Sequence, residues 1–324
     1  ITLTTTNSNV TFGGTTNAGT AGNTLTVAAG TGDVTFTGAI GGSTAMGNTT
    51  ITTGALSAAA IKVQGTLSIT NSDTSTITGI ISDGATSAIL TKAGSGTLTL
   101  SANNTYSGAT NINVGILSIT HNNALGSAAG TTTVASGAAL SISNNITIGE
   151  SISIAGTGIS SNGAIRNTAD ANTITGLITQ TAHSEIQIDT GSSLTLNPSI
   201  GNAVTGTYNL TIESVGTTTI SDPIATSTGN IIKTGAGTLT LSGTNTYSGD
   251  TTISNGTIKL TGAVNAATDL IIASGATLDL QAMQTFASLD LDGTISRSAG
   301  TSTLTITGTS DIGGSITTSG TQDY

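Results

Sequence analysis

The fold of this chain is decided by a stretch that occurs twice: Lys92-Ala-Gly-Ser-Gly-Thr-Leu-Thr-Leu-Ser-Ala-Asn-Asn-Thr-Tyr-Ser-Gly108 and Lys233-Thr-Gly-Ala-Gly-Thr-Leu-Thr-Leu-Ser-Gly-Thr-Asn-Thr-Tyr-Ser-Gly249. The correspondence continues without a gap through Gly115–Ile119 and Gly256–Leu260. Duplication of short strand-like units is typical of a solenoid. The positions that define the repeat are Gly96, Leu98, Leu100, Tyr106 and Gly108, and in the second copy Gly237, Leu239, Leu241, Tyr247 and Gly249.

The composition agrees with a solenoid built from strands. The 324 residues include 44 Gly and 2 Pro, and only 7% are charged, too few for the wet face of ordinary amphipathic helices. Hydrophobic residues make up 35% and the mean hydropathy is +0.22, so the chain is not a disordered polar tract. Aromatic residues are only 2% of the chain. We therefore expect a thin core of stacked aliphatic side chains.

Charge and cysteine content exclude several classes of function. There is no cysteine, which excludes thiol chemistry, thiolate metal sites and disulfides. A net charge of −10 with six Lys plus Arg argues against nucleic acid and against an anionic membrane as partner. No apolar run is long enough to span a membrane, so direct membrane insertion is not expected. The chain begins at Ile1 within the strand pattern, which indicates a mature processed product or a fragment.

Polar and aliphatic residues alternate along most of the chain, as in Thr97–Leu100 and Thr277–Leu280. Such alternation predicts strands with one buried and one wet face, separated here by Gly, Asn and Ser-Gly turns. A sandwich or an up-and-down barrel would also alternate, but aromatic core residues and hairpin dipeptides are scarce. We therefore predict an all-β, right-handed parallel β-helix of about 16 coils. Residues 1–324 are expected to form a single continuous domain.

The run Gly-Thr-Leu-Thr-Leu-Ser, Asn-Thr-Tyr-Ser-Gly, Gly-Thr-Ile-Lys-Leu closely resembles the autotransporter-associated β-strand repeat of type V secreted passenger domains. A companion unit of that repeat is similar to Ser151–Gly158 and to the segments around Asn162, Asn172 and Ile186. The two resemblances extend from about Gly79 to Leu280. They imply a β-helix at the bacterial cell surface or outside the cell that serves as an adhesin, coat or stalk. The translocator barrel of such proteins is not part of this sequence.

Recurring polar residues in the repeat have both a functional and a structural interpretation. Tyr106 and Tyr247 could form a sugar-binding platform, but we expect each to cover the end of a coil while its hydroxyl caps a turn carbonyl. Lys92 and Lys233 stand at the entrance to a glycine-rich turn. That turn is too short for a phosphate loop and leads into a strand, so no nucleotide or other cofactor is expected.

Carboxylates matter because parallel β-helices also host polysaccharide lyases and hydrolases. Asp290 and Asp292, with Asp279 one strand earlier, form the best local cluster. Leu289 and Leu291 should point inward, which turns both neighbouring aspartates toward solvent. The three aspartates are weak candidates for a calcium site or an acid pair. The competing interpretation is a charged outer face that discourages lateral strand pairing.

Two further patterns are weaker. His183, Glu185 and one of many serines could be drawn as a triad, but no nucleophile-elbow motif accompanies them, and His121 lies in a polar loop. Thr-x-Thr pairs such as Thr97/Thr99 and Thr238/Thr240 could form an ice-binding plane if they were in register on successive coils. They look scattered along the sequence, and the β-propensity of threonine accounts for them.

The sequence therefore predicts a non-enzymatic extracellular β-helical rod with a structural or adhesive role. Both ends, Ile1–Thr4 and Asp311–Thr318, look like further coils rather than caps, so copies of the chain could stack head to tail through their terminal coils into filaments. A pectin-lyase-like enzyme is the alternative, and an ice-binding protein is the less favoured third possibility. The adhesion ligand, a glycan or a protein of host or matrix, is not specified by any motif.

Overall fold

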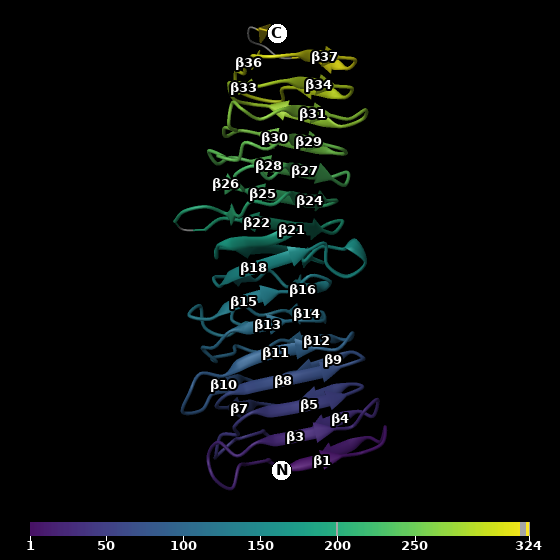
Figure 1. The fold of residues 1–324 in the computed structure, drawn as a ribbon, viewed down its shortest axis with the longest axis vertical. Helices are drawn as coiled ribbons and strands as arrows, with labels where there is room; N and C mark the ends of the chain where they lie inside the picture. Colours follow the sequence, from purple (N-terminus) through teal and green to yellow (C-terminus); the bar gives the residue numbers. More distant parts are fainter. Residues whose placement is uncertain (199, 318–321, 324) are drawn as a thin grey trace. The chain divides into compact units, whose positions relative to one another are not determined.

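The computed structural model describes residues 1–198, 200–317, 322 and 323. The chain divides into two compact units, residues 1–153 and 154–324. Both are built from short parallel strands stacked as a β-solenoid, and together they hold about 15 turns (Figure 1). The predicted all-β parallel solenoid is confirmed. The single continuous domain stays a prediction.

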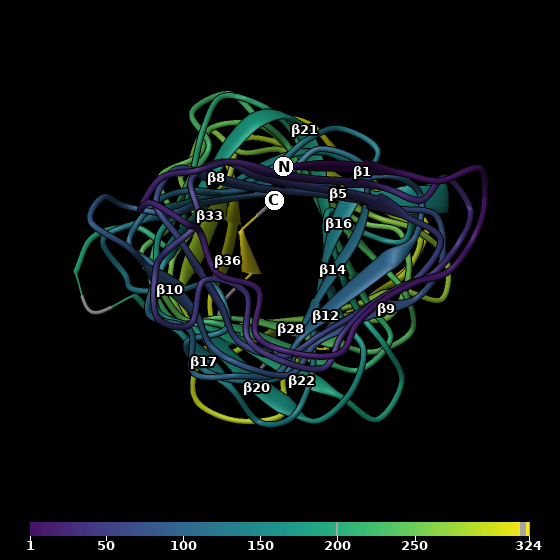
Figure 2. The ribbon, with the colours of Figure 1, turned by 90° about the horizontal axis from the view of Figure 1, so that it is seen from below.

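Two long ladders of parallel strands form most of unit 1. Figure 2 shows β5 and β8 on one side of the solenoid and β12 and β14 on another. The first ladder contains β1 (Thr2–Thr4), β3 (Leu25–Ala28), β5 (Thr49–Thr53), β8 (Thr66–Asn71), β11 (Ile89–Ala93), β13 (Thr110–Ile112) and β15 (Thr131–Val134). The second contains β2 (Val10–Phe12), β4 (Val34–Phe36), β6 (Leu56–Ala58), β9 (Ser75–Ile77), β12 (Thr97–Leu100), β14 (Gly115–Ile119) and β16 (Ala138–Ile142). The remaining strands are β7 (Ile61–Val63), β10 (Ile81–Asp83) and β17 (Thr147–Ile148), and β18 (Ser151–Gly156) crosses the boundary between the units.

Unit 2 also has two long ladders. We call the first ladder A: β19 (Ile165–Asn167), β21 (Ile178–Ile188), β24 (Leu210–Ser214), β27 (Ile231–Thr234), β29 (Thr251–Ile253), β31 (Leu270–Ile272), β34 (Leu289–Leu291) and β37 (Ser310–Ile312). Ladder C contains β20 (Ala171–Ile174), β22 (Ser193–Leu196), β25 (Thr217–Ile220), β28 (Thr238–Leu241), β30 (Thr257–Leu260), β32 (Thr277–Leu280), β35 (Thr294–Ser296) and β38 (Ser315–Ile316). Shorter strands are β23 (Val204–Thr205), β26 (Ile224–Ala225), β33 (Gln284–Phe286), β36 (Leu304–Ile306) and β39 (Gln322–Asp323), and a 3-10 turn covers Ile159–Ser161.

The core of each unit consists of rows of inward side chains that repeat from coil to coil. Period two along each strand sends every second residue inward, and in-register parallel pairing stacks equivalent residues. The repeat leucines behave as predicted: Leu98, Leu100 and Leu239 are 0% exposed and Leu241 is 1% exposed. Among the described residues no helix is long and apolar enough to cross a membrane.

Candidate functional site

A lysine lies in the middle of an aliphatic row in each copy of the repeat. In unit 1, Lys92 stacks between Ile69 and Ile112 of the neighbouring coils. In unit 2, Lys233 stacks in the same way between Ile212 and Ile253. Both lysine residues are 0% exposed. They are therefore core residues of the solenoid.

Backbone carbonyl oxygens surround the ammonium group of each lysine. Lys92 Nζ donates to the carbonyls of Ala93 (2.9 Å), Gly94 (2.7 Å) and Val114 (3.1 Å). Lys233 Nζ donates to the carbonyls of Thr234 (2.5 Å), Gly235 (2.6 Å), Asn255 (3.2 Å) and Ser214 (3.3 Å). The acceptors come from the lysine's own turn, from the following coil and, for Lys233, also from the preceding coil at Ser214, so Lys92 joins two coils and Lys233 joins three. We call this arrangement the lysine cage.

Burial lowers the pKa of Lys92 to about 8, and it lowers the pKa of Lys233 to about 8 as well, where the charge of Glu213 acts in the opposite direction. Both lysines therefore remain mainly protonated at neutral pH. The charged form has three N–H donors and can serve three carbonyls at once, whereas the neutral amine has only two. The lysine cage is thus complete in the protonated state.

Glycine is required beside the cage at Gly115 and Gly256. Their φ angles are +79° and +71°, a region that favours glycine. A Cβ at Gly115 would also meet the carbonyl oxygens of Gly94 and Gly96, and it would lie 2.7 Å from Lys92 Nζ. The same close approach to two turn carbonyls occurs at Gly256. The repeat therefore couples a bare backbone position to a buried lysine.

Buried asparagines connect three successive coils in both copies. Asn104 Oδ1 accepts the backbone N–H of Ile81 (2.8 Å), and its Nδ2 donates to the carbonyl of Ala124 (2.6 Å). Asn245 accepts from Ile224 (3.0 Å) and donates to Ala263 (2.9 Å). Each side chain thus satisfies one donor in the coil before it and one acceptor in the coil after it.

The repeat tyrosines are buried inside the solenoid. Tyr106 and Tyr247 are 0% exposed, which removes both from any sugar-binding surface. Their hydroxyls pair with the hydroxyls of Thr110 (2.7 Å) and Thr251 (2.8 Å). The prediction that the hydroxyl caps a turn carbonyl is wrong, because a threonine four residues later supplies the partner. Burial raises the pKa of Tyr247 to about 12, despite the hydrogen bond to Thr251, which acts to lower it.

Glu150 is a buried carboxyl group that the sequence did not point to. It is 3% exposed, Oε1 accepts from the hydroxyl of Thr132 at 3.1 Å, and Oε2 has no partner among the described residues. Burial raises the pKa of Glu150 to about 7, against the opposing effect of the bond from Thr132. The charge of Glu150 adds to burial in raising the pKa of Tyr106. Thr132 stacks on Thr110, so these groups form one buried polar cluster in unit 1.

The three candidate aspartates do not converge. Asp290 on β34 of ladder A and Asp292 just after that strand are exposed, and their neighbours Leu289 and Leu291 point inward as predicted. Asp279 lies instead on β32 of ladder C, so its expected place in the cluster is wrong. No group of three potential metal ligands exists in the described part of the chain.

Both oxygens of the Asp279 carboxylate accept hydrogen bonds from residues that follow strands β32 and β35. The carboxylate accepts the backbone N–H and the hydroxyl of Ser298 (2.8 and 2.6 Å) and the amide of Gln281 (2.7 Å). Burial acts to raise the pKa of Asp279, but these hydrogen bonds and the charge of Lys259 outweigh it and hold the pKa below its ordinary value. Asp279 is thus an ionised group that joins two strands.

The histidines also take part in local structure. His183 Nδ1 accepts the backbone N–H of Asn209 (3.0 Å), and its ring meets Tyr208 edge-on at 5.7 Å. Glu185 is occupied elsewhere: burial raises its pKa to about 7, and the charge of Glu213 and a hydrogen bond with it act in the same direction. These contacts do not pair His183 with Glu185, so they do not form the catalytic triad that the sequence allowed.

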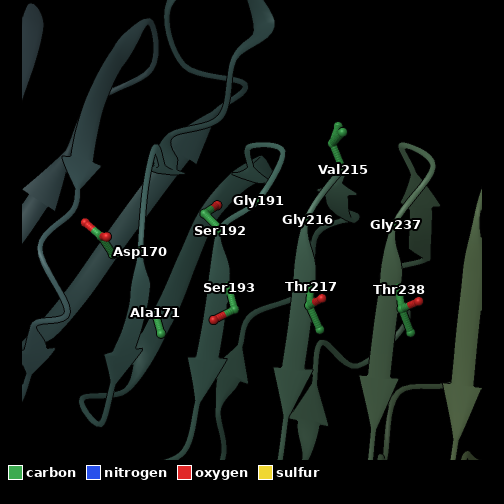
Figure 3. A pocket seen from close by; sticks show the side chains of 10 residues that line it. All are labelled: Asp170, Ala171, Gly191, Ser192, Ser193, Val215, Gly216, Thr217, Gly237 and Thr238. Atoms are coloured by element: carbon green, nitrogen blue, oxygen red, sulfur yellow. The ribbon is translucent and has the colours of Figure 1, made fainter.

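A polar groove of about 510 Å³ runs across the beginning of four strands of ladder C (Figure 3). Three turn glycines, Gly191, Gly216 and Gly237, leave the backbone bare, and Ser193, Thr217 and Thr238 follow at the strand starts. Asp170 is the one ionisable side chain among the described lining residues. The groove offers hydroxyls, backbone groups and one carboxylate.

The Thr-x-Thr pairs of ladder C are in register, contrary to our expectation that they are scattered. Thr217 stands between Ser193 and Thr238, and two residues further along each strand Thr219 stands between Thr195 and Thr240. The sequence hid this alignment because turn length varies from coil to coil. Figure 3 shows the first of these columns, with Ser193, Thr217 and Thr238 on adjacent strands.

The family model of the passenger-associated-transport-repeat matches residues 90–119 and 231–260. These are the two copies of the repeat, one in each unit, and they include the lysine cage, the buried asparagine and the buried tyrosine. No curated protein and no solved structure matches the chain. The two repeats and the β-solenoid that contains them fit an autotransporter passenger domain.

Proposed function

We propose that this chain is a non-enzymatic passenger rod, exported to the cell surface or the extracellular medium, with a structural or adhesive role. The proposal rests on one observation: the polar residues that distinguish the repeat form internal contacts of the solenoid. Lysine, asparagine and tyrosine are all buried in both copies, and each bonds to the solenoid itself. Residues committed to internal contacts hold a shape and leave recognition to the outer faces of the coils.

Adhesion is tested by offering the purified chain to an array of glycans and extracellular-matrix proteins. The proposal expects binding that survives Tyr106→Phe and Tyr247→Phe, because those side chains are internal. Binding that disappears in these variants, with the fold retained by circular dichroism, would contradict it.

Head-to-tail association belongs to the same proposal. The strand β1 is exposed along its length, with Leu3 36% exposed; Ile1, just before it, is 77% exposed, and Ile312 on β37 is 44% exposed. An uncovered strand edge with apolar residues favours pairing with another chain. Because the two ends present different surfaces, such pairing would be non-closing and would give filaments.

Electron microscopy and sedimentation across concentration and salt test this association. Filaments are expected for the parent chain and for the control Val114→Lys, which alters an exposed apolar residue, 47% exposed, within the stack. The double variant Leu3→Lys with Ile312→Lys is expected to remain monomeric. Monodisperse single chains of the parent under all conditions would exclude self-assembly.

The competing class, a pectin-lyase-like enzyme, is tested at Asp290 and Asp292. Acidic polysaccharides are incubated with calcium and either the parent chain or the Asp290→Asn, Asp292→Asn variant. The proposal expects the same background in both. Cleavage by the parent that the variant loses would replace the structural role with an enzymatic one.

A further inference from the structure

The outer surface of ladder C carries a block of hydroxyl side chains arranged in rows and columns, and one of its columns borders the groove described above. Each of three adjacent strands, β22, β25 and β28, contributes two outward hydroxyl residues separated by one inward residue. In-register pairing aligns them into two columns. The six residues, which we call the hydroxyl block, are Ser193, Thr195, Thr217, Thr219, Thr238 and Thr240.

These side chains are directed outward and are available. Thr217 is exposed and the other five are half-buried, while the residues between them, such as Leu194 and Leu239, are 0% exposed. Among the described residues, no side-chain hydrogen bond occupies any of the six hydroxyls. Their bonding capacity is therefore directed at solvent or at a ligand.

The first column continues beyond the block through Thr257, Thr277 and Thr294. In the second column the hydroxyl residues stop at Thr240. The next two positions of that column are Lys259 on β30 and Asp279 on β32, which are neighbours in register. The block is thus an uncharged, non-aromatic area with a charged boundary on one side. None of the six side chains is aromatic or charged, so the block itself offers no ring on which a sugar could stack.

The spacing of the block is set by the sheet. Neighbouring strands lie about 4.8 Å apart, and residues two apart on one strand lie about 6.7 Å apart. Threonine is stiff at χ1, so its methyl and hydroxyl groups hold fixed positions on the strand. A regular two-dimensional lattice of hydroxyls and methyls with these repeats approximates the spacing of water oxygens on a face of ice. Because the lattice exists before binding, little entropy is lost when water orders on it.

From this arrangement we infer that the hydroxyl block is an ice-binding surface: ordered water above the six side chains merges with the lattice of an ice crystal. This activity goes beyond the structural or adhesive role and does not depend on it. The occupant is frozen water itself, which a repetitive array of uncharged hydroxyls in register fits better than a branched or charged polymer.

Ladder A of the same unit supplies the contrast. Its outward column is Thr211, Ile232, Thr252, Ile271 and Asp290, so hydroxyls alternate with larger aliphatic groups and end at a charge. It has the same strand spacing but no continuous lattice. A substitution on ladder A therefore leaves the hydroxyl block unchanged.

The test uses the purified chain of residues 1–324 and ice as the probe. Thermal hysteresis and inhibition of ice recrystallisation are measured for the parent, for Thr219→Lys with Thr240→Lys, and for the control Thr252→Lys on ladder A. The block variant is expected to lose activity by at least about tenfold, because two long charged side chains hold the ice front away. The control is expected to match the parent.

A second, more conservative variant separates a loss of ice binding from a loss of folding. Thr219→Ser with Thr240→Ser keeps both hydroxyls, deletes both methyls and hardly alters the sheet, and its activity is expected to fall several-fold. Circular dichroism and melting temperature are recorded for all variants. No activity in the parent, or equal activity in the parent and the folded block variants, would overturn the inference.

Discussion

The two copies of the repeat, residues 90–119 in unit 1 and 231–260 in unit 2, share their internal contacts but differ in their surroundings. Lys92 has three carbonyl acceptors, whereas Lys233 has four and feels the charge of Glu213. Tyr106 lies near the buried carboxyl group of Glu150, and no such carboxyl acts on Tyr247. The comparison teaches that the repeat specifies its own core bonds, while neighbouring coils adjust their strength and their response to pH.

The lysine cage gives the largest expected effect. Lys92→Met leaves buried carbonyls without a donor, and each such group costs about 1–3 kcal/mol, so the free energy of unfolding should fall by about 3–5 kcal/mol. Lys233→Met should cost about the same, because its fourth acceptor, the carbonyl of Ser214, keeps the backbone N–H of Gly237 as a donor. Urea unfolding followed by circular dichroism measures both. A change no larger than that of Lys259→Met, a lysine on the outer surface of the second copy, would break the comparison.

The asparagine bridge comes next. Asn104→Ala and Asn245→Ala each leave an N–H and a carbonyl unpaired in the neighbouring coils, which predicts a loss of about 2–4 kcal/mol. The two losses should be similar, because both side chains make equivalent bonds to the coils before and after. The same unfolding experiment applies, with Asn103→Ala as a neighbouring control. A loss confined to one copy would show that the bridge is not a property of the repeat.

The raised pKa of Glu150 predicts that stability depends on pH. This residue lies near the first copy of the repeat and, among the described residues, has no equivalent near the second. The pKa of Glu150 is about 7 in the folded chain and 4.5 for an ordinary glutamate, which represents the unfolded chain, so the folded state binds the proton more tightly. This contribution to stability is complete below about pH 4.5 and is lost as the pH rises to 7, by about 3 kcal/mol.

Glu150→Gln should flatten that part of the stability profile, since the amide stays neutral. Unfolding free energies measured from pH 4 to 8 for the parent and the variant give the difference. Glu185, whose pKa is also raised to about 7, leaves a remaining slope of the same sign in the variant. Identical profiles in the two proteins would mean that Glu150 does not titrate in this range.

Removing the tyrosine hydroxyls is expected to have the smallest effect on the free energy of unfolding. Tyr106→Phe and Tyr247→Phe each remove one hydroxyl pair while keeping the ring, so about 1 kcal/mol should be lost. The melting temperatures of the two variants are compared at pH 5, where Glu150 is mainly protonated, and at pH 8. We expect Tyr106→Phe to depend on pH more than Tyr247→Phe, and equal dependence would remove the influence of Glu150 on the first copy.

Alternation predicted the fold because inward leucines such as Leu98 and Leu239 repeat with period two, and parallel stacking needs no further information. The same period also places Lys92 two residues after the buried Leu90, so its inward position was visible in the pattern. It was overlooked because an aliphatic row is not expected to accept an ammonium group. The three-dimensional structure shows that carbonyl oxygens of the turns compensate the charge.

The hydroxyl block and the separation of the aspartates could not be predicted in the same way. Both depend on which residues become neighbours across coils, and that depends on the number of residues in each turn. Asp279 and Asp290 are close in sequence yet lie on different ladders, whereas Thr217 and Thr238 are distant in sequence yet adjacent in register. A sequence read without turn geometry cannot distinguish these cases.

The most direct test of the central claim, that the repeat's distinctive residues are internal supports, is the reactivity of the four lysines. The native chain is treated with an amine-reactive reagent near pH 7.5, and labelling is quantified by mass spectrometry. Lys92 and Lys233 are expected to stay protected while Lys62 and Lys259 react, and all four should react once the chain is unfolded. Native labelling of Lys92 and Lys233 at the rate of Lys259 would contradict the claim.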